Sequence, residues 1–267
     1  MVLRSGWLGI CFLGLGCVAL PTINPDPTVA AARHLWDEGQ EAMKRGQTDE
    51  AIALYEQSLA EDPKLTCNHL SLAAAYLEKD DLGHACPHLA EYVEANPDRL
   101  TFRLHYAEVL TRLKRFADAR LQFECTICAM QEQGTWANHN LIRCHGRLVA
   151  LAMQSEDEYD EHLHRGIGLY LLARQRSAMS DPEGELPAEG LLCKAAAELT
   201  AATQQRPNEA RPSWYLYEVW SHLGQQHPAA CRLREAESAG PFTYLTPVEQ
   251  RDLQLALLSY NGALIQK

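Results

Sequence analysis

Apolar residues recur every three to four positions through most of this chain, which is the spacing that places them on one face of an α-helix. The stretch after Thr66 shows this spacing twice, in Leu72, Ala73 and Tyr76 and again in Ala85, Leu89 and Tyr92. Polar residues fill the positions between, and Pro63 and Pro97 each stop a helical pattern. The pattern predicts pairs of amphipathic helices joined by short turns.

The same small residue returns at a fixed interval of 34 residues. The series comprises Ala51, Ala85 and Ala119, and later Ala195 and Ala229. A proline follows most of these alanines twelve residues later, at Pro63, Pro97, Pro207 and Pro241. A period of this length is typical of stacked helix–turn–helix units, each of which contacts only its neighbours. The sequence therefore predicts a solenoid of helical hairpins.

These repeats resemble the tetratricopeptide repeat family. The family places a small residue where the first helix of a unit crosses the second, here Gly39, Ala73 and Ala107. It places another small residue early in the second helix, where this chain has the alanine series. Small side chains at the crossing let the two helices approach closely. The resemblance implies an all-α, right-handed superhelical solenoid of tetratricopeptide-like hairpins.

The repeat predicts three units over residues 31–133 and further repeats over residues 191–243. Between Ala119 and Ala195 lie 76 residues (195 − 119), eight more than two periods. Residues 134–190 are therefore expected to form an irregular helical segment with an inserted loop at 180–190. This segment is either an irregular hairpin or a single helix followed by a hairpin with a stretched loop. Ser155 and Glu158 have the spacing of a capping box at the start of one of its helices.

The end of the chain, residues 244–267, predicts a C-terminal capping helix. Thr246 and Glu249 have capping-box spacing, and Pro247 suits the first helical position between them. Leucines at helical spacing follow. We expect this helix to cover the open end of the stack.

The resemblance also implies a binding surface, because in this family the first helix of each unit lines a concave groove. The groove-facing candidates are Arg33, Trp36, Gln40, Lys44, Leu70, Ala74, Glu78, Leu104, Glu108, Arg112, Arg211, Trp214, Glu218 and His222. Trp36 and Trp214 are the candidates for anchors, since aromatic side chains dominate many protein interfaces. The alternative for both tryptophans is burial against the neighbouring unit.

A different interpretation rests on Cys125, Cys128 and Cys144, which together with His145 offer the ligand types of a zinc site. The first two cysteines lie within a helical pattern, whereas zinc pairs of this spacing usually lie on a turn. They also lie near the end of that helix, and a low thiol pKa is typical of a helix start. We therefore favour packing as small apolar residues, and expect neither a metal nor a cofactor.

Composition and motifs narrow the function. The net charge is −11 and the basic residues are scattered, which argues against a nucleic-acid partner. The sequence has no phosphate-binding loop, nucleophile elbow, zinc-protease motif or dinucleotide fingerprint. We therefore predict a non-enzymatic scaffold that holds a protein or peptide partner. The alternatives are a metal- or redox-active helical protein and a self-assembling structural array.

The N-terminus predicts export or membrane anchoring. Arg4 precedes an apolar run from Trp7 to Leu20, the layout of a secretory signal, and these fourteen residues are few for a membrane span. Residues 1–20 are thus interpreted as a signal peptide or N-terminal anchor, with lipid attachment at Cys17 as a further alternative. Residues 21–30 hold three prolines and read as a linker. These features favour the periplasm or cell envelope over the cytoplasm.

Overall fold

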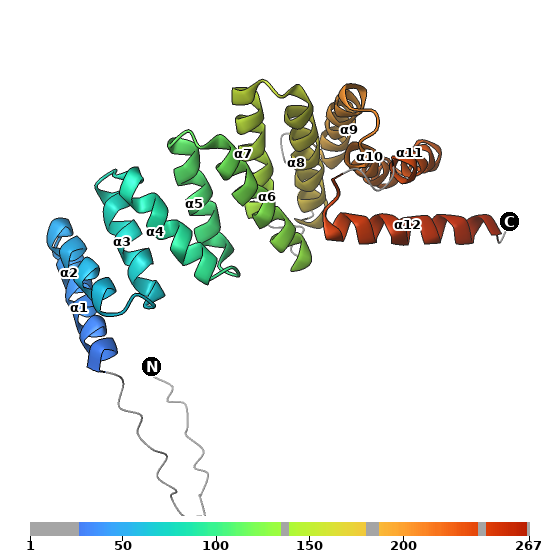
Figure 1. Ribbon diagram of the computed structural model, residues 1–267. Coiled ribbons are helices and arrows are strands. Elements are labelled where there is room, and N and C mark those ends of the chain that lie inside the picture. The colour runs from blue at the N-terminus through green and yellow to red at the C-terminus, as the bar shows by residue number, and fades with distance from the viewer. Residues whose placement is uncertain (1–26, 135–138, 180–186, 240–243, 266–267) are drawn as a thin grey trace, which may run out of the picture. The chain divides into compact units, whose positions relative to one another are not determined.

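The computed structural model describes residues 27–134, 139–179, 187–239 and 244–265. Within these ranges the regular secondary structure is entirely α-helical (Figure 1). The predicted signal or anchor segment and most of the predicted linker lie outside the described residues. No described helix has the length and apolar character needed to span a membrane.

The chain divides into two compact units, Met1–Leu65 and Thr66–Lys267. In the first unit, α1 (Pro27–Lys44) and α2 (Thr48–Glu61) form one helical hairpin. The second unit contains α3 (Thr66–Glu78), α4 (Leu82–Ala95), α5 (Leu100–Arg112), α6 (Phe116–Glu132), α7 (His139–Ser155), α8 (Glu158–Met179), α9 (Ala188–Gln205), α10 (Ala210–His222), α11 (Gln226–Ser238) and α12 (Pro247–Ile265). Helices that follow one another in this unit pack together, so the fold is the predicted all-α solenoid of tetratricopeptide-like hairpins.

Small residues lie where the helices of each hairpin meet. The alanines of the 34-residue series are all buried, at 0–2 % exposure. In the first unit a Cβ atom on Gly39 would lie 2.5 Å from a ring carbon of Tyr55 in α2. Only a residue without a side chain allows the two helices to approach this closely. The small-residue positions predicted from the sequence therefore set the spacing of the helices.

The turns inside the hairpins repeat at the same interval. Gly46, Asp80 and Lys114 are 34 residues apart, and all three have a left-handed backbone with φ between 58° and 73°. After α5, the N–H of Arg115 donates to the carbonyl oxygen of Leu110, and that of Lys114 donates to Thr111. This is the Schellman arrangement that satisfies the last carbonyl groups of a helix. A non-glycine residue in this conformation costs about 1–2 kcal/mol, so the repeat geometry imposes the turn on Asp80 and Lys114.

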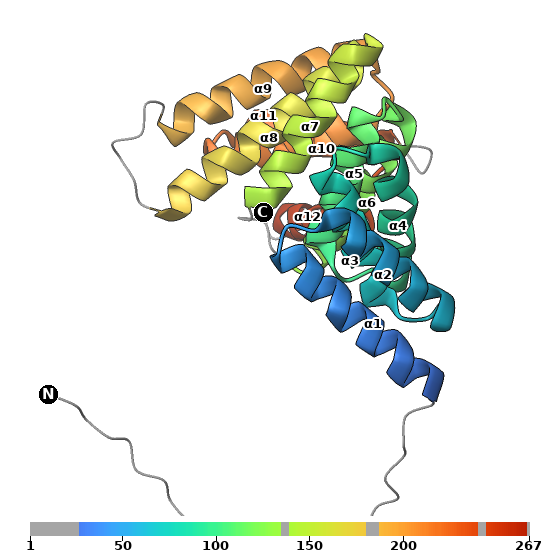
Figure 2. The ribbon, with the colours of Figure 1, turned by 90° about the vertical axis from the view of Figure 1, so that its left-hand side faces the viewer.

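Between α6 and α10 the described residues form three helices, α7, α8 and α9, in place of the four that two hairpins would supply. Helix α8 packs against α7 on one side and α9 on the other, and both ribbon views show the three helices side by side (Figures 1 and 2). Tyr159, Leu163, Ile167 and Tyr170 form one buried stripe of α8, and beside it Gly166 lies against Leu199 of α9 and His164 contacts His145 of α7. The buried surface of α8 therefore includes a glycine and a polar residue, so this stretch lacks the purely apolar pattern from which the repeat was recognised.

Two sequence predictions about this stretch are corrected. Ser155 does not cap α8, because its hydroxyl donates to carbonyl oxygens of Leu151 and Ala152 and ends α7. Asp157 caps α8 instead, accepting a hydrogen bond from the N–H of Asp160 at 3.1 Å. The predicted loop at 180–190 is also too long, since α9 begins at Ala188; residues 180–186 lie outside the described part of the chain.

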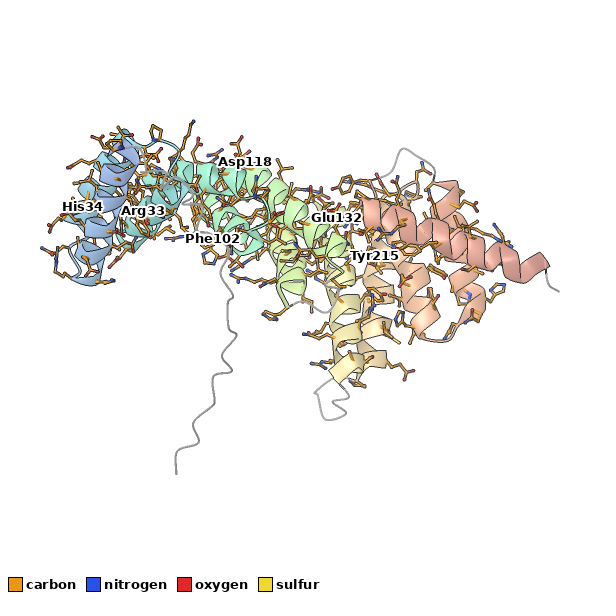
Figure 3. All side chains as sticks on the ribbon, turned by 90° about the horizontal axis from the view of Figure 1, so that it is seen from below. Arg33, His34, Phe102, Asp118, Glu132 and Tyr215 are labelled. Carbon is orange, nitrogen blue, oxygen red and sulfur yellow. The ribbon has the colours of Figure 1, made fainter. Side chains whose placement is uncertain are left out.

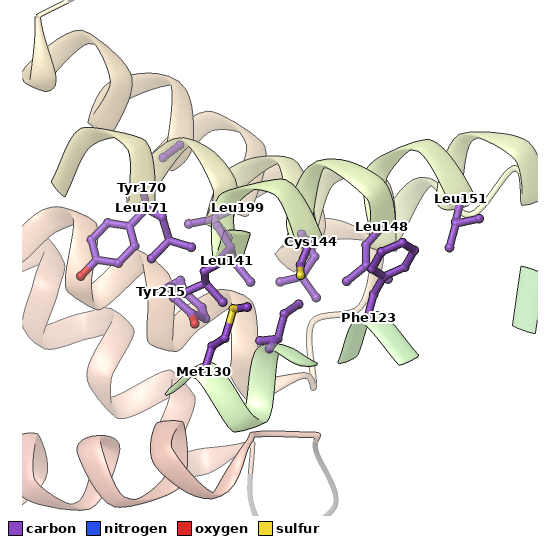
Figure 4. Packing of buried hydrophobic residues seen from close by; sticks show 14 of the residues in the cluster. Phe123, Met130, Leu141, Cys144, Leu148, Leu151, Tyr170, Leu171, Leu199 and Tyr215 are labelled. Atoms are coloured by element: carbon purple, nitrogen blue, oxygen red, sulfur yellow. The ribbon is translucent and has the colours of Figure 1, made fainter. Parts of the chain in front are cut away.

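The core of the second unit runs through successive helices without a break. Phe123 and Met130 of α6 pack with Leu141, Cys144 and Leu148 of α7 (Figure 4). The same cluster continues through α8 and α9 to α10 and reaches Leu253 of α12. Burial of this apolar surface is the main stabilising contribution.

We predict that Gly166→Ala destabilises the second unit. A Cβ atom on Gly166 would lie 2.6 Å from Cγ of Leu199 and 3.2 Å from the backbone nitrogen of Leu199. Overpacking at such a contact costs about 1–3 kcal/mol, against about 1 kcal/mol gained in helix propensity. The matched control is Gly146→Ala, because nothing lies within 4 Å of that position. Denaturant unfolding should show a loss for the first variant and a gain of up to about 1 kcal/mol for the second; equal effects would contradict a close α8–α9 contact.

Candidate partner-binding surface

Side chains of α5, of α7 and of the turn after α3 meet on one surface of the second unit. The guanidinium of Arg112, on α5, pairs with Asp80, which follows α3. Glu108, one turn earlier on α5, pairs with both Arg143 and Arg147 of α7. These groups are part-exposed, so each pair contributes little to stability. They do leave charged, partly hydrated side chains on α5, on α7 and in the turn after α3.

The predicted groove residues of this surface differ in exposure. Ala74, Glu78 and Arg112 are exposed, and Leu70 and Glu108 are partly buried. Leu104 is buried at 3 % exposure within the core, so its predicted groove position is wrong. Sequence reasoning missed Arg143 and Arg147, although each lies 35 residues after a predicted groove residue, Glu108 and Arg112.

In the first unit, the predicted groove residues lie on α1. Arg33 is exposed (Figure 3), whereas Trp36 and Gln40 are partly buried. Trp36, Gln40 and Lys44 line an open cavity of about 780 Å³ together with residues of the same hairpin. Lys44 also donates to Glu41 at 2.6 Å.

Arg211 does not face a groove, which corrects its prediction. Its guanidinium is buried and donates through Nε and Nη2 to Oε1 of Glu249 in α12, at 3.1 and 2.9 Å. The hydroxyl of Tyr215 donates to the same oxygen at 2.7 Å. Burial opposes the charge on Arg211, but Glu249 outweighs it and raises the pKa of Arg211. The side chain holds α12 in place and is not available to a partner.

Glu249 has a second role that the sequence did predict. The N–H of Thr246 donates to Oε2 of Glu249 at 3.0 Å, and the N–H of Glu249 donates to the Thr246 hydroxyl at 3.2 Å. The capping box at the start of α12 is therefore confirmed. The Thr246 hydroxyl also donates to the side chain of Gln131 at 2.7 Å, which ties α12 to the end of α6.

Trp214 is 4 % exposed, so the prediction that it stands in an open groove is wrong as well. It lines a cavity of about 320 Å³ between α8, α10 and α12, with Tyr170, Arg174, Tyr215, Glu218, Asp252, Leu255 and Ala256. The hydroxyl of Tyr170 donates to Oε2 of Glu218 at 2.6 Å. His222, also a predicted groove residue, is exposed and lies edge-on to the Tyr170 ring. Of the predicted residues of α10, Trp214 and Glu218 thus line an aromatic pocket.

Two histidines form a buried pair between α7 and α8. Nδ1 of His145 lies 3.1 Å from Nδ1 of His164, and both residues are at most 2 % exposed. Burial, assisted by the charge of Arg211, lowers the pKa of His145 to about 3. Burial and the neighbouring His145 lower the pKa of His164 well below its usual value. The pair is neutral at pH 7.

The three cysteines of the metal or redox interpretation differ in burial: Cys144 is buried, whereas Cys125 and Cys128 are partly exposed. Cys144 is fully buried, and desolvation raises its pKa to about 12. Burial also raises the pKa of Cys128. Protonated thiols are poor nucleophiles and poor metal ligands. Within the described ranges, no three side chains of histidine, cysteine, aspartate or glutamate are grouped so as to hold a metal ion.

Comparison with known proteins gives one curated relative and many remote structural neighbours. No known family model matches the chain. Mouse Superkiller complex protein 3 is 28 % identical over 163 residues, which is 60 % of this chain and 10 % of that protein. The chain therefore spans about a tenth of the length of this relative.

Solved structures that align with the chain include PilF of Pseudomonas aeruginosa, which is 14 % identical with a TM-score of 0.38. That alignment covers 86 % of this chain and all of PilF. MamA of Desulfovibrio magneticus RS-1 is 13 % identical with a TM-score of 0.35, over 78 % and 94 % of the two chains. YrrB, described as a TPR protein with an unusual peptide-binding site, is 14 % identical with a TM-score of 0.33, over 86 % and 98 %.

The decisive feature is internal to the chain: buried alanines and left-handed turns both recur at 34 residues in consecutive helical hairpins. Its fold is a solenoid of tetratricopeptide-like helical hairpins. The α7–α8–α9 segment is the part of this tetratricopeptide-like chain that departs from the repeat.

We predict that Arg211→Met lowers the free energy of unfolding by about 3–5 kcal/mol, because it leaves the Glu249 carboxylate buried without its ion-pair partner. Adding Glu249→Leu to this variant should cost much less than Glu249→Leu alone. A double-mutant cycle in denaturant measures the coupling. Additive losses would show that the two side chains act independently.

We also predict that stability falls between pH 7.5 and 5.5. A histidine whose folded pKa is depressed binds fewer protons when folded, so stability decreases as pH falls below the unfolded pKa of about 6.5. One such group gives a loss of about 1.4 kcal/mol at pH 5.5. His145→Gln should reduce the difference in unfolding free energy between the two pH values by this amount, and replacement of the exposed His222 by Gln should not. An unchanged difference in the His145 variant would contradict a neutral buried pair.

Proposed function

We propose that this protein is a non-enzymatic scaffold that holds a segment of a partner protein against the first-helix surface of its repeats. The supporting observation is the surface formed by α5, α7 and the turn after α3, where Arg112 and Glu108 of α5 and Arg143 and Arg147 of α7 stand partly exposed. Exposed ion pairs of this kind exchange readily with the charges of a partner, because they contribute little to folding. Such charges fix register and partner choice.

The same proposal includes export or membrane anchoring through the N-terminus. Its support is the apolar run from Trp7 to Leu20 after Arg4, followed by a proline-containing linker. Together these features favour a scaffold in the cell envelope.

A metal- or redox-active protein is a weaker candidate, because burial keeps the thiols of Cys128 and Cys144 protonated. For the third candidate, a self-assembling structural array, no contact or surface among the described residues gives specific support. The scaffold is therefore the function that the structure favours.

We predict that Arg143→Ala combined with Arg147→Ala weakens capture of a specific partner at least about tenfold, while leaving thermal unfolding nearly unchanged, as expected for exposed ion pairs. The matched control is Arg232→Ala with Arg234→Ala on α11, whose arginines are paired with Glu235 and with the Tyr260 hydroxyl. Full-length protein is used to capture partners from native membranes, followed by quantitative mass spectrometry of prey and of the bait N-terminus.

The supporting result is a protein retained by the wild type and by the α11 variant but lost with the α7 variant, and then bound by purified wild type in calorimetry. Equal retention by both variants would overturn the proposed surface. The mass of the bait N-terminus reports whether residues 1–20 are cleaved or retained.

A further inference from the structure

We propose that the pocket between α8, α10 and α12 receives a single basic side chain, lysine or arginine, of the partner segment. This inference rests on the proposed scaffold function and gives the partner a chemical character. The pocket is the cavity of about 320 Å³ lined by Trp214, Tyr170 and their neighbours, and it lies entirely within the second unit.

The walls of this pocket are aromatic. Tyr170 lines it from α8, and Trp214 and Tyr215 line it from α10. At the rim, Leu255 of α12 is 55 % exposed. Aromatic faces attract a cation through their quadrupole, and apolar rims accommodate the methylene stem of lysine or arginine. A long basic side chain fits both properties.

The charge balance of the pocket points the same way. Two carboxylates, Glu218 and Asp252, line it together with one guanidinium, that of Arg174. Arg174 lies over the Tyr170 ring, 5.7 Å from its centroid, and also interacts with the Tyr170 hydroxyl. The lining therefore carries one negative charge in excess.

Both carboxylates retain capacity to accept hydrogen bonds. Oε2 of Glu218 accepts from the Tyr170 hydroxyl, and within the described residues Oε1 takes part in no hydrogen bond. Asp252 has a long ion pair, 3.7 Å, with Arg251, whose side chain is 64 % exposed. Such an exposed contact is weak and easily exchanged. A guanidinium or ammonium group entering the pocket would gain charge-assisted hydrogen bonds from these oxygens.

The net charge of −11 supports the same ligand at longer range. An acidic protein raises the local concentration of basic segments around it, and this steering falls with ionic strength. Binding at this pocket should therefore weaken with added salt.

The test uses two small probes of nearly the same shape, N-acetyl-arginine amide and its neutral counterpart N-acetyl-citrulline amide. Isotope-labelled full-length protein is titrated with each probe, and nuclear magnetic resonance follows the indole signal of Trp214, assigned from a Trp214→Phe variant. We expect the arginine probe to shift this signal and to bind about tenfold more tightly than the citrulline probe. Equal affinities, or no shift of the Trp214 signal by the arginine probe at millimolar concentration, would overturn the proposal.

Variants separate charge recognition from simple filling of a cavity. Glu218→Gln with Asp252→Asn keeps the shape of the pocket and should reduce the affinity for the arginine probe to that for citrulline. Glu237→Gln, at the exposed end of α11, is the matched control and should leave both affinities unchanged. Unaltered binding of the arginine probe to the double variant would count against the pocket.

This experiment is independent of the capture experiment on Arg143 and Arg147, because the two sets of residues lie on different helices. Loss of arginine binding together with intact, Arg143- and Arg147-dependent capture would overturn the pocket and retain the scaffold. Failure of that capture would overturn the scaffold surface whatever the probes show.

Discussion

The closeness with which two helices cross is the constraint on which this structure depends. A ring of Tyr55 occupies the space where Gly39 would carry a side chain, and Leu199 does the same at Gly166. Where the residue is alanine, it is fully or almost fully buried. A larger side chain at these points would push the helices apart, and every later contact of the hairpin would lose surface. The repeat is thus a recurrence of small residues at the helix crossings, and this recurrence can be recognised in the sequence.

Much of the fold could therefore be predicted from the sequence. Ala51, Ala85 and Ala119 predicted the hairpins, and Thr246 with Glu249 predicted the start of α12. The three-helix segment could not be predicted in detail, because α8 packs on both α7 and α9 and its buried surface includes Asp160, His164 and Gly166, which no apolar pattern marks. The left-handed turns at Asp80 and Lys114 gave no signal either, since neither residue is glycine. Local preference was overruled there by the packing of the helices on either side.

The candidate site was less predictable than the fold. Groove positions were assigned by register, and register cannot tell whether another helix covers the position. Trp214 and Arg211 are covered because α12 reaches the α10 region, a contact between residues 38 positions apart in the case of Arg211 and Glu249. Arg143 and Arg147 were missed because they lie 35 residues, not 34, after Glu108 and Arg112, at the start of the stretch where the 34-residue period fails.

Gln131 at the end of α6 is hydrogen-bonded to Thr246 and Glu249 at the start of α12. This link affects how cooperatively the second unit unfolds. In an open stack each repeat touches only its neighbours, and the chain can fray from its last repeat inward. Here side chains more than one hundred positions apart share one hydrogen-bonded cluster. Detachment of α12 would remove Glu249, the ion-pair partner of Arg211, and leave the buried guanidinium without a counter-charge. The terminal repeats therefore open together with the middle of the chain, which gives the far end of the stack the cooperativity of a globular domain.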